Sequence, residues 1–501
     1  MKKYVTKNIF INTLACPTLG WLMRVMEAKK PEPPTLGEIF RMEQGRDIEV
    51  RARSLYPGGL LIEDANLELS HKKTIGAIKN REVSAIFGAT FLMDGFVTKA
   101  DILQRIKGGW RLNEVKSSIV DKPEFIDDMA YTTMVAEKGG LKISETSLIL
   151  ISKDFRLGMG NDRLFTKIDH TDEVQSRVDL FKPYWEIVEK ITRAPKKPDA
   201  KLKFVCRKCE LFKECLGASI KNHIFGIPRL SEKKYDELAA HGIVRIEDIP
   251  DSFSLTERQA RVRECVKKNQ PFVGTELKKC LESLSWPVYY LDFETVTTAI
   301  PLYPDIAPYE KIPTQYSVHK CLRPGRDTEH YEFLADPNRD CRKEFVENLI
   351  GTLGDSGNIV VYGNFEKTIL SSFADTLPSF SSEIKSLTDR MVNLEQIVSA
   401  NFYHPDFHGS TSIKVVLPVL APEISYDSLE IKDGDSAVAA FAYLALGRYK
   451  GEKAEEMKKN LKAYCAQDTL ALYKVHQRLT QICGSKFEQQ GSHRQVSLEK
   501  F

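Results

Sequence analysis

Residues 288–295, Val-Tyr-Tyr-Leu-Asp-Phe-Glu-Thr, decide the fold of the C-terminal part of the chain. The alternation of side chains predicts a strand that presents Asp292 and Glu294 on one face, two residues apart. The aromatic and aliphatic residues around them favour a buried strand over an acidic edge that faces solvent. Because unpaired carboxylates are costly in a buried setting, the two acids predict a cation between them.

Two later segments add acidic residues to this pair. A predicted strand over residues 358–362 runs into an amphipathic helix, and Glu366 lies at the turn between them. Near the C-terminus, a predicted helix carries Tyr464 and Asp468 four residues apart, on one face. Lys414 follows Gly-Ser-Thr-Ser at 409–412, where it either meets a phosphate or caps a helix.

Together these residues resemble the DEDDy exonucleases of the ribonuclease H-like fold, over about residues 286–482. Asp292 and Glu294 match the first motif, Glu366 the second, and Tyr464 with Asp468 the third. The family normally has Asp where this chain has Glu366, which is one methylene longer. The resemblance implies that Asp292, Glu294 and Asp468 hold two Mg²⁺ or Mn²⁺ ions, while Glu366 assists and Tyr464 orients the attacking water. The segment also looks like an uncharacterised domain found fused to RecB-type nucleases.

A second charged group lies in the predicted hairpin over residues 99–118. The Gly-Gly pair at 108–109 predicts a two-residue turn, which places Asp101 opposite Lys116 and Glu114 on the same face. Two carboxylates and an ammonium can hold a divalent cation and orient its water. The alternative is an exposed hairpin with a cross-strand salt bridge.

The N-terminal part, over roughly residues 1–216, resembles the RecB-like branch of the PD-(D/E)xK nucleases. Asp101 and Glu114-Val115-Lys116 match the signature positions, so the resemblance implies a metal held by Asp101 and Glu114. That family often adds a histidine from an upstream helix, where this chain offers Glu49. A downstream helix usually supplies Gln and Tyr, and here it offers Tyr131 without the Gln.

The cysteines suggest a further metal site. The spacing Cys206-x2-Cys209-x5-Cys215 allows three thiolates to face one centre. In RecB-like nucleases of the AddB and CRISPR-adaptation kinds, an N-terminal helix supplies the fourth ligand, and the resemblance implies Cys16 for that role. We therefore expect a [4Fe-4S] cluster that joins the two ends of the domain. Structural zinc and unmetallated cysteines in a helical turn are the alternatives.

The length of 501 residues exceeds a single core and predicts about three globular units. The Pro/Lys-rich stretch 193–198 precedes the first boundary. We expect an α/β chain with a restriction-endonuclease-like domain over 1–216, a small helical segment over 217–285 and a ribonuclease H-like domain over 286–501. The middle segment is either a spacer or a degenerate helix-hairpin-helix module that holds phosphates.

A formal charge of +3 predicts that any nucleic-acid surface is a local basic groove. No apolar run approaches the ~18 residues that a membrane span needs. The N-terminal run is interrupted by polar residues, which favours a helix over an export signal, so we expect a cytoplasmic protein with no membrane contact.

The sequence predicts a metal-dependent nuclease with two centres, which degrades DNA exonucleolytically from duplex ends or single strands in DNA processing, repair or defence. One alternative is a nucleic-acid-binding scaffold in which one or both sites have decayed. Another is an exoribonuclease, because DEDD chemistry does not require a deoxyribose.

Overall fold

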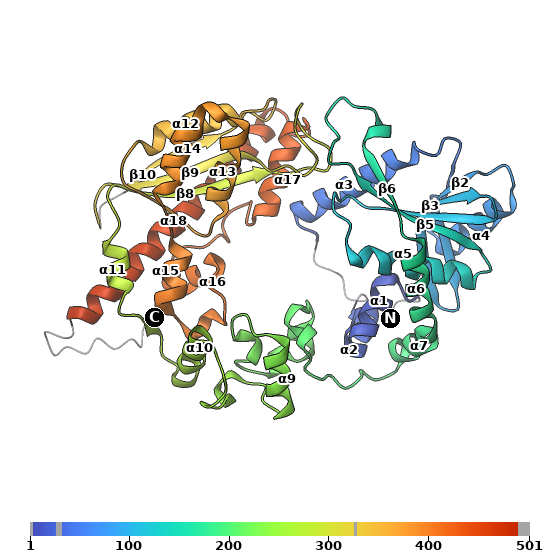
Figure 1. Cartoon of the computed structure of the whole chain (residues 1–501), viewed down its shortest axis with the longest axis horizontal. Coiled ribbons are helices and arrows are strands. Elements are labelled where there is room, and N and C mark those ends of the chain that lie inside the picture. The colour runs from blue at the N-terminus through green and yellow to red at the C-terminus, as the bar shows by residue number, and fades with distance from the viewer. Residues whose placement is uncertain (1–3, 27–32, 325–327, 489–501) are drawn as a thin grey trace. The chain divides into compact units, whose positions relative to one another are not determined.

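The computed structural model describes residues 4–26, 33–324 and 328–488, and the chain divides into two compact units (Figure 1). Unit 1 comprises residues 1–216 with 297–310, and unit 2 comprises residues 217–296 with 311–501. Both units combine helices with a mixed sheet, so the α/β class predicted from the sequence is confirmed. Within the described residues, no helix is long and apolar enough to cross a membrane.

The sheet of unit 1 has six strands in chain order: β1 (Leu60–Leu61), β2 (Ala85–Met93), β3 (Phe96–Ile106), β4 (Gly109–Val115), β5 (Ile143–Ile151) and β6 (Phe165–Asp169). β2, β3 and β4 form an antiparallel meander, whereas β4 and β5 are parallel. Parallel neighbours need a crossover connection, and α5 (Pro123–Lys138) supplies it.

The other helices of unit 1 are α1 (Lys7–Ala15), α2 (Pro17–Met26), α3 (Leu36–Arg53), α4 (Leu67–Lys79), α6 (Thr171–Phe181), α7 (Trp185–Arg193) and α8 (Phe212–Cys215). The helix predicted for the N-terminal run is therefore present. α5 packs against α1 and the sheet, and its Met129 and Tyr131 are fully buried in the core of the unit. This packing fixes α1 beside β3 and β4, the strands that carry Asp101 and Glu114.

The register of the β3–β4 hairpin differs from the prediction by two residues. Ile106 pairs with Gly109, so the turn is Lys107-Gly108, and Gly108 adopts the positive φ of +94° that favours glycine. The pairing continues to Ile102 with Asn113, which brings Asp101 opposite Glu114 rather than Lys116. Because side chains alternate with a period of two, a two-residue shift keeps every side chain on its predicted face.

The sheet of unit 2 has five strands in the order β10–β9–β8–β11–β12. They are β8 (Val288–Val296), β9 (Ile312–Cys321), β10 (Thr328–Leu334), β11 (Asn358–Val361) and β12 (Met391–Asn393). β8 is central, antiparallel to β9 and parallel to β11, and β11 is parallel to β12. The strands predicted over 288–295 and 358–362 are therefore present.

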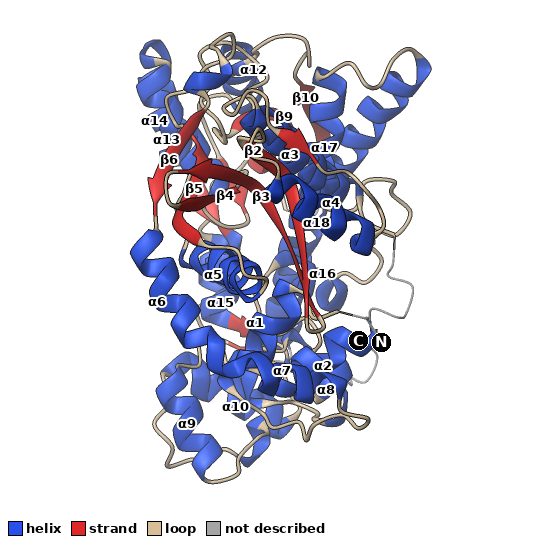
Figure 2. Ribbon diagram, turned by 90° about the vertical axis from the view of Figure 1, so that its right-hand side faces the viewer, coloured by secondary structure: helices blue, strands red, loops and turns tan. Residues whose placement is uncertain are grey.

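Seven helices follow in unit 2: α12 (Arg342–Leu353), α13 (Phe365–Thr376), α14 (Ser381–Asp389), α15 (Leu394–Asn401), α16 (Ile413–Leu420), α17 (Gly434–Ala445) and α18 (Glu452–Glu488). Leu291 and Phe293 of β8 pack in one core with α12, α13 and α14. The alternate residues of β8 face the other way, where the Tyr290 hydroxyl lies 2.7 Å from Nδ1 of His476 on α18. Helices thus cover both faces of the sheet (Figure 2).

The middle segment contains α9 (Glu232–Ala240), α10 (Glu257–Lys268), β7 (Phe272–Val273) and α11 (Leu277–Glu282). β7 pairs with β13 (Phe402–Tyr403), and this segment, expected from the sequence as a helical stretch between two domains, belongs to unit 2. Residues 297–310 were expected in the last domain but belong to unit 1, where the Tyr309 hydroxyl donates to the Ser117 carbonyl. Short 3₁₀ turns span Asn161–Arg163, Lys182–Tyr184, Phe204–Lys208, Gly217–Ser219, Ile224–Gly226, Ile246–Asp248, Pro378–Phe380 and Pro405–Phe407.

Candidate metal centres

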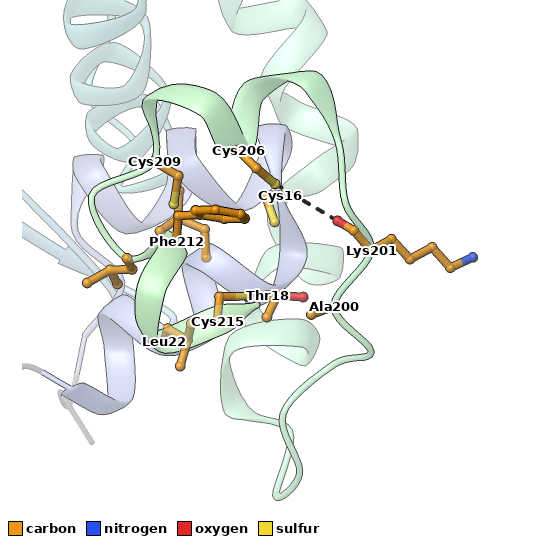
Figure 3. Close-up of a pocket in the computed structure, with 11 residues that line it drawn as sticks. Cys16, Thr18, Leu22, Ala200, Lys201, Cys206, Cys209, Phe212 and Cys215 are labelled. Carbon is orange, nitrogen blue, oxygen red and sulfur yellow. Dashed lines mark hydrogen bonds between the residues drawn. The ribbon is translucent and has the colours of Figure 1, made fainter. Parts of the chain in front are cut away.

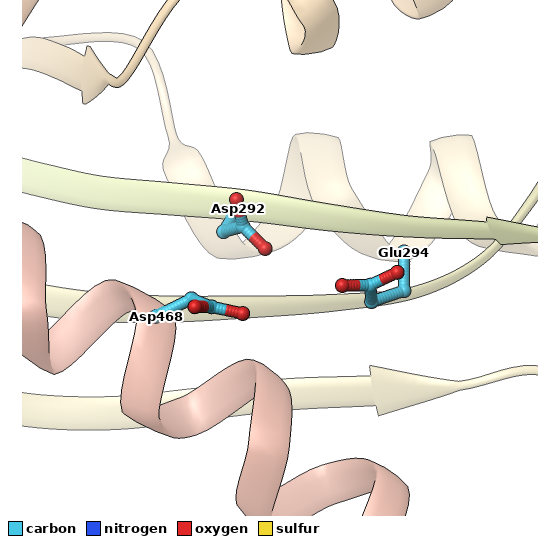
Figure 4. Close-up of side chains that lie close together, drawn as sticks. All are labelled: Asp292, Glu294 and Asp468. Atoms are coloured by element: carbon cyan, nitrogen blue, oxygen red, sulfur yellow. The ribbon is translucent and has the colours of Figure 1, made fainter. Parts of the chain in front are cut away.

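The acid cluster of unit 2 consists of Asp292, Glu294 and Asp468 (Figure 4). Each of the three offers a carboxylate oxygen within 4.8 Å of the other two. Within the described residues, this is the one set of three or more His, Cys, Asp or Glu side chains that meets this spacing. All three side chains are partly exposed, so water and ions have access to them.

The convergence follows from the local structure. Asp292 and Glu294 are two residues apart on β8 and share the face that α18 covers. Asp468 lies on α18, one turn after Tyr464, which is buried on the same side of the helix. Residues far apart in the sequence thus meet because a helix packs over the acidic face of a central strand.

Burial and mutual repulsion raise the pKa values of the cluster. Burial raises the pKa of Asp292 well above its usual range, and the carboxylates of Asp468 and Glu366 raise it further. Burial and Asp468 raise the pKa of Glu294 in the same way, while the Lys414 ammonium opposes the shift. The pKa of Asp468 rises to about 6, chiefly through burial. A cation among these groups would remove the repulsion.

Glu366 extends the cluster from α13. It is 3% exposed, and its Oε2 is buried with no hydrogen-bond partner. Burial raises its pKa to about 7, and Asp468 contributes to the rise. A buried carboxylate oxygen that lacks a donor is rare in folded proteins and is accounted for when an ion or its water lies there.

Two tyrosines adjoin Asp468. Burial and the neighbouring carboxylates raise the pKa of Tyr464, so its hydroxyl stays protonated and available as a donor. The Tyr426 hydroxyl donates to Oδ1 of Asp468 at 2.6 Å, and the two tyrosine rings are 6.0 Å apart. Tyr426 was not predicted, because it lies between α16 and α17, where no periodic pattern marks it.

The donor chemistry of the acid cluster fits a hard divalent cation. Mg²⁺ and Mn²⁺ favour carboxylate oxygens as ligands. Here four acids contribute to one region, and Lys414 is the lysine whose positive charge lowers the pKa values of Glu294 and Asp468. The residues present therefore fit the metals that the sequence resemblance implies.

The charged group of unit 1 centres on Lys116. Its Nζ lies 2.8 Å from Oε1 of Glu114 and 2.6 Å from Oδ2 of Asp128. Although burial alone lowers it, the pKa of Lys116 is raised overall because these two carboxylates lie beside the ammonium. Oδ2 of Asp101 accepts a hydrogen bond from the backbone N–H of Val115 at 2.8 Å. The predicted Asp, Glu and Lys thus gather at one place.

Lys7 also reaches this group, from the first residue of α1. Its Nζ lies 2.9 Å from Oδ2 of Asp128 and 3.6 Å from Oε1 of Glu114. Lys7 and Asp128 were not assigned from the sequence, since each is an ordinary helical residue. Only the packing of α1 and α5 against the sheet brings them to Lys116.

Glu49 and Tyr131 have different positions relative to this group. Burial and the Glu114 carboxylate raise the pKa of Asp101 well above its usual range, and Glu49 adds to the rise. Glu49 therefore lies close enough to act on the site. Tyr131 lies in the core, where its hydroxyl donates to the carbonyls of Val5 and Val97 at 2.7 and 3.1 Å, so its contacts support a structural role and not a site role.

Cys16, Cys206, Cys209 and Cys215 line one pocket with apolar side chains such as Leu22 and Phe212 (Figure 3). Burial raises the pKa of Cys209 and of Cys215, and the other pocket thiols add to both shifts. No three of these sulfur atoms lie within 4.8 Å of one another among the described residues. Tetrahedral zinc holds sulfurs about 3.8 Å apart, given Zn–S bonds of about 2.3 Å. The four thiols thus share one pocket without the close spacing of a tetrahedral zinc site, and the [4Fe-4S] cluster expected from the sequence stays a prediction.

Comparison with known proteins gives two findings. Residues 289–412 match the model of a domain of unknown function, DUF2779. The matched range includes Asp292, Glu294 and Glu366 and ends before Tyr464 and Asp468.

Two uncharacterised mycoplasma proteins are similar to part of the chain. Protein MG366 of Mycoplasma genitalium is 22% identical over 222 residues, and its homolog in Mycoplasma pneumoniae is 24% identical over 223 residues. Each alignment covers 40% of this chain and 33% of the relative. The chain thus matches about a third of the length of these relatives, and neither name states an activity.

Proposed function

We propose that the protein is a metal-dependent nuclease that hydrolyses phosphodiester bonds of DNA, with its principal centre at the acid cluster of unit 2. The observation that carries this proposal is the convergence of Asp292, Glu294 and Asp468 within 4.8 Å. The buried Oε2 of Glu366, which has no hydrogen-bond partner, supports the proposal because this oxygen is available as a further metal ligand. The DEDDy resemblance, which rests on the same acids, agrees with it.

The unit 2 sheet also supports the ribonuclease H-like assignment. Its first strand, β8, is central. On one side β9 pairs antiparallel with β8 and β10 antiparallel with β9, and on the other side β11 and β12 follow by parallel pairing. The central strand carries the first two acids, and a helix after the sheet supplies the last one.

In this mechanism, divalent ions held by the cluster would activate a water molecule and stabilise the attacking and leaving oxygens of the phosphate. Asp292, Glu294 and Asp468 would hold the ions through their carboxylates, and Glu366 would supply a further oxygen. Tyr464, protonated at neutral pH, donates a hydrogen bond that orients the nucleophile. Tyr426 fixes the rotamer of Asp468 through its 2.6 Å hydrogen bond.

We assign a second, PD-(D/E)xK-type centre to Asp101, Glu114 and Lys116, with Glu49 beside them. Lys116 orients the water or stabilises charge on the phosphate. This centre is the weaker of the two, because its ammonium groups already pair with Glu114 and Asp128. That pairing favours the scaffold alternative for unit 1 more than for unit 2. A [4Fe-4S] cluster at the four cysteines would have a structural role in holding α1 and the segment after α7 together.

The test is a nuclease assay on labelled single- and double-stranded DNA and RNA with Mg²⁺ or Mn²⁺. We expect Asp292→Asn to lower the rate at the main centre by at least about 100-fold, because the loss of a ligand removes several kcal/mol of charge stabilisation. Lys116→Ala should remove a separate, smaller part of the cleavage. Asp389→Asn, an exposed acid on α14, is the control and should cut like the parent. If the double variant of Asp292 and Lys116 cleaves at the parental rate, the proposal is wrong, and preferential cleavage of RNA would select the exoribonuclease alternative.

A further inference from the structure

Three arginines of the middle segment lie close together in unit 2. Arg258 and Arg261 are one turn apart on α10, and Gln259 between them donates to the Arg229 carbonyl at 3.5 Å. We call Arg229, Arg258 and Arg261 the arginine cluster. Burial lowers the pKa of Arg258, and the positive charge of Arg229 lowers it further. Glu395 opposes this shift and Arg261 adds to it. A partly buried guanidinium that is repelled by two others is stabilised when an anion binds among them.

The arginine cluster is built into the fold. The Arg261 guanidinium stacks 4.2 Å from the centre of the Phe272 ring and donates to the Ala400 carbonyl. Nη2 of Arg258 donates to Oγ1 of Thr411 at 3.4 Å. Arg229 is exposed to solvent. The cluster therefore combines one fixed, one half-buried and one accessible cation.

The loop over residues 409–412 connects this cluster to the acid cluster. Gly409 has φ +85°, and a Cβ there would lie 2.1 Å from the Gly226 carbonyl oxygen, so only glycine permits this close approach to the middle segment. The Tyr362 hydroxyl donates to the Thr411 carbonyl at 2.7 Å and holds the loop from the other side. The loop therefore has a fixed position between the arginines and α16.

Lys414 lies at the far end of this loop, in the first turn of α16. Its side chain is exposed, and α16 packs against α18, the helix that carries Asp468. Lys414 is thus close to the candidate reacting centre, whereas Thr411 contacts the arginine cluster. The three residue steps between them span at most about 10 Å of chain.

We infer that the arginine cluster and Lys414 form a track for the phosphates of single-stranded nucleic acid, leading from the middle segment to the acid cluster. This inference rests on the proposed function for its direction, since the strand end lies at the acids. At the roughly 3.4 Å per nucleotide of a stacked strand, the stretch between Lys414 and Thr411 holds on the order of three nucleotides, and the arginine cluster lies beyond it. The cluster contacts backbone charge and not bases, so DNA and RNA should respond alike.

The test measures binding without cleavage. Fluorescein-labelled (dT)12, (rU)12 and (dT)3 are titrated against the full chain in EDTA, at several salt concentrations. We expect the double variant Arg229→Gln/Arg258→Gln to bind both 12-mers about tenfold or more weakly, since a charged hydrogen bond contributes about 1.5–3 kcal/mol. The salt slope should fall by about 0.7 for each phosphate that the variant no longer neutralises. Affinity for (dT)3 should change by less than twofold.

Two further variants make the outcome specific. Arg339→Gln removes an exposed arginine of unit 2 outside the cluster and should bind the 12-mers like the parent. Arg258→Lys keeps the charge but loses the planar fork, and should fall between the parent and Arg258→Gln. Parental binding by the double variant overturns the track. An equal loss of affinity in Arg339→Gln also overturns the track, and so does a loss of affinity for (dT)3 as large as the loss for (dT)12. Because EDTA prevents cleavage, the binding result is separate from the nuclease assay. Parental cleavage by the double variant of Asp292 and Lys116 would overturn the proposed function and leave the binding result standing.

Discussion

Glu366→Gln is expected to stabilise unit 2 at neutral pH in the absence of metal. In the folded protein the pKa of Glu366 is about 7, against an ordinary value of 4.5. A carboxyl whose pKa is raised by folding binds its proton more tightly in the folded state. That stability is fully present below pH 4.5 and is lost as the pH rises through 7. The isosteric amide carries no charge and escapes this loss.

The magnitude follows from the difference between the two pKa values. Each pH unit between the two pKa values corresponds to about 1.4 kcal/mol of unfolding free energy. Most of the interval between the two pKa values lies between pH 5 and pH 7.5. Glu366 should therefore contribute about 2 kcal/mol to the unfolding free energy that unit 2 of the metal-free parent loses over that range. Glu366→Gln should remove this contribution. Asp292 and Glu294, whose pKa values are also raised, and Asp468, whose pKa is about 6, keep a pH dependence in the variant.

Unfolding of unit 2 must be read separately, because a chain with two units does not unfold in two states. Pulsed hydrogen exchange with mass spectrometry at increasing urea follows peptides from β8 and α13. Adding Mg²⁺ to 100 times its dissociation constant should restore about 2.7 kcal/mol to the parent at pH 7.5, and less to the variant. Glu347→Gln, an exposed acid on α12, is the control. The reasoning is refuted if the parent shows equal stability at both pH values, or if the control variant loses its pH dependence as well.

Three further predictions concern single side chains. Tyr426→Phe removes the hydrogen bond to Asp468 and should weaken Mn²⁺ binding about tenfold by titration calorimetry, and parental affinity would contradict its positioning role. Cys16→Ser should abolish the broad absorbance near ~400 nm that we expect of the anaerobically purified protein, while Cys280→Ser retains it; a colourless parent loaded with zinc would exclude the cluster. Lys7→Met should lower the activity of the unit 1 centre about tenfold when the unit 2 centre is inactivated. The reason is that Lys7, together with Lys116, holds the Asp128 carboxylate in place. Unchanged cleavage would make Lys7 merely structural.

Local patterns predicted the residues that share a strand or a helix face. The alternation around Asp292 and the four-residue spacing of Tyr464 and Asp468 are properties of a single element, so the sequence sufficed for both. The hairpin shows the limit of this reasoning. The Gly-Gly pair marked the turn, but the turn uses Lys107-Gly108, and the partner of Asp101 changed while its face did not.

Residues supplied by tertiary packing escaped prediction. Tyr426 reaches Asp468 from an irregular segment, and Lys7 reaches Glu114 from a helix more than a hundred residues upstream. Neither carries a local signal, because its role depends on which elements pack together. Tyr131 shows the opposite error. Its place in the family pattern suggested a site role, whereas its hydroxyl binds two backbone carbonyls in the core.

The two centres differ in how their charge is balanced without metal. In unit 1, Lys116 and Lys7 share Glu114 and Asp128, so the carboxylates already have protein counter-ions. In unit 2, burial and neighbouring carboxylates raise the pKa values of Asp292, Glu294 and Glu366, and the exposed Lys414 opposes the shift of Glu294. A divalent ion entering unit 2 relieves repulsion, whereas one entering unit 1 must compete with two ammonium groups. The same residue types therefore give unit 2 the larger electrostatic gain from binding metal, which is why we place the principal centre there.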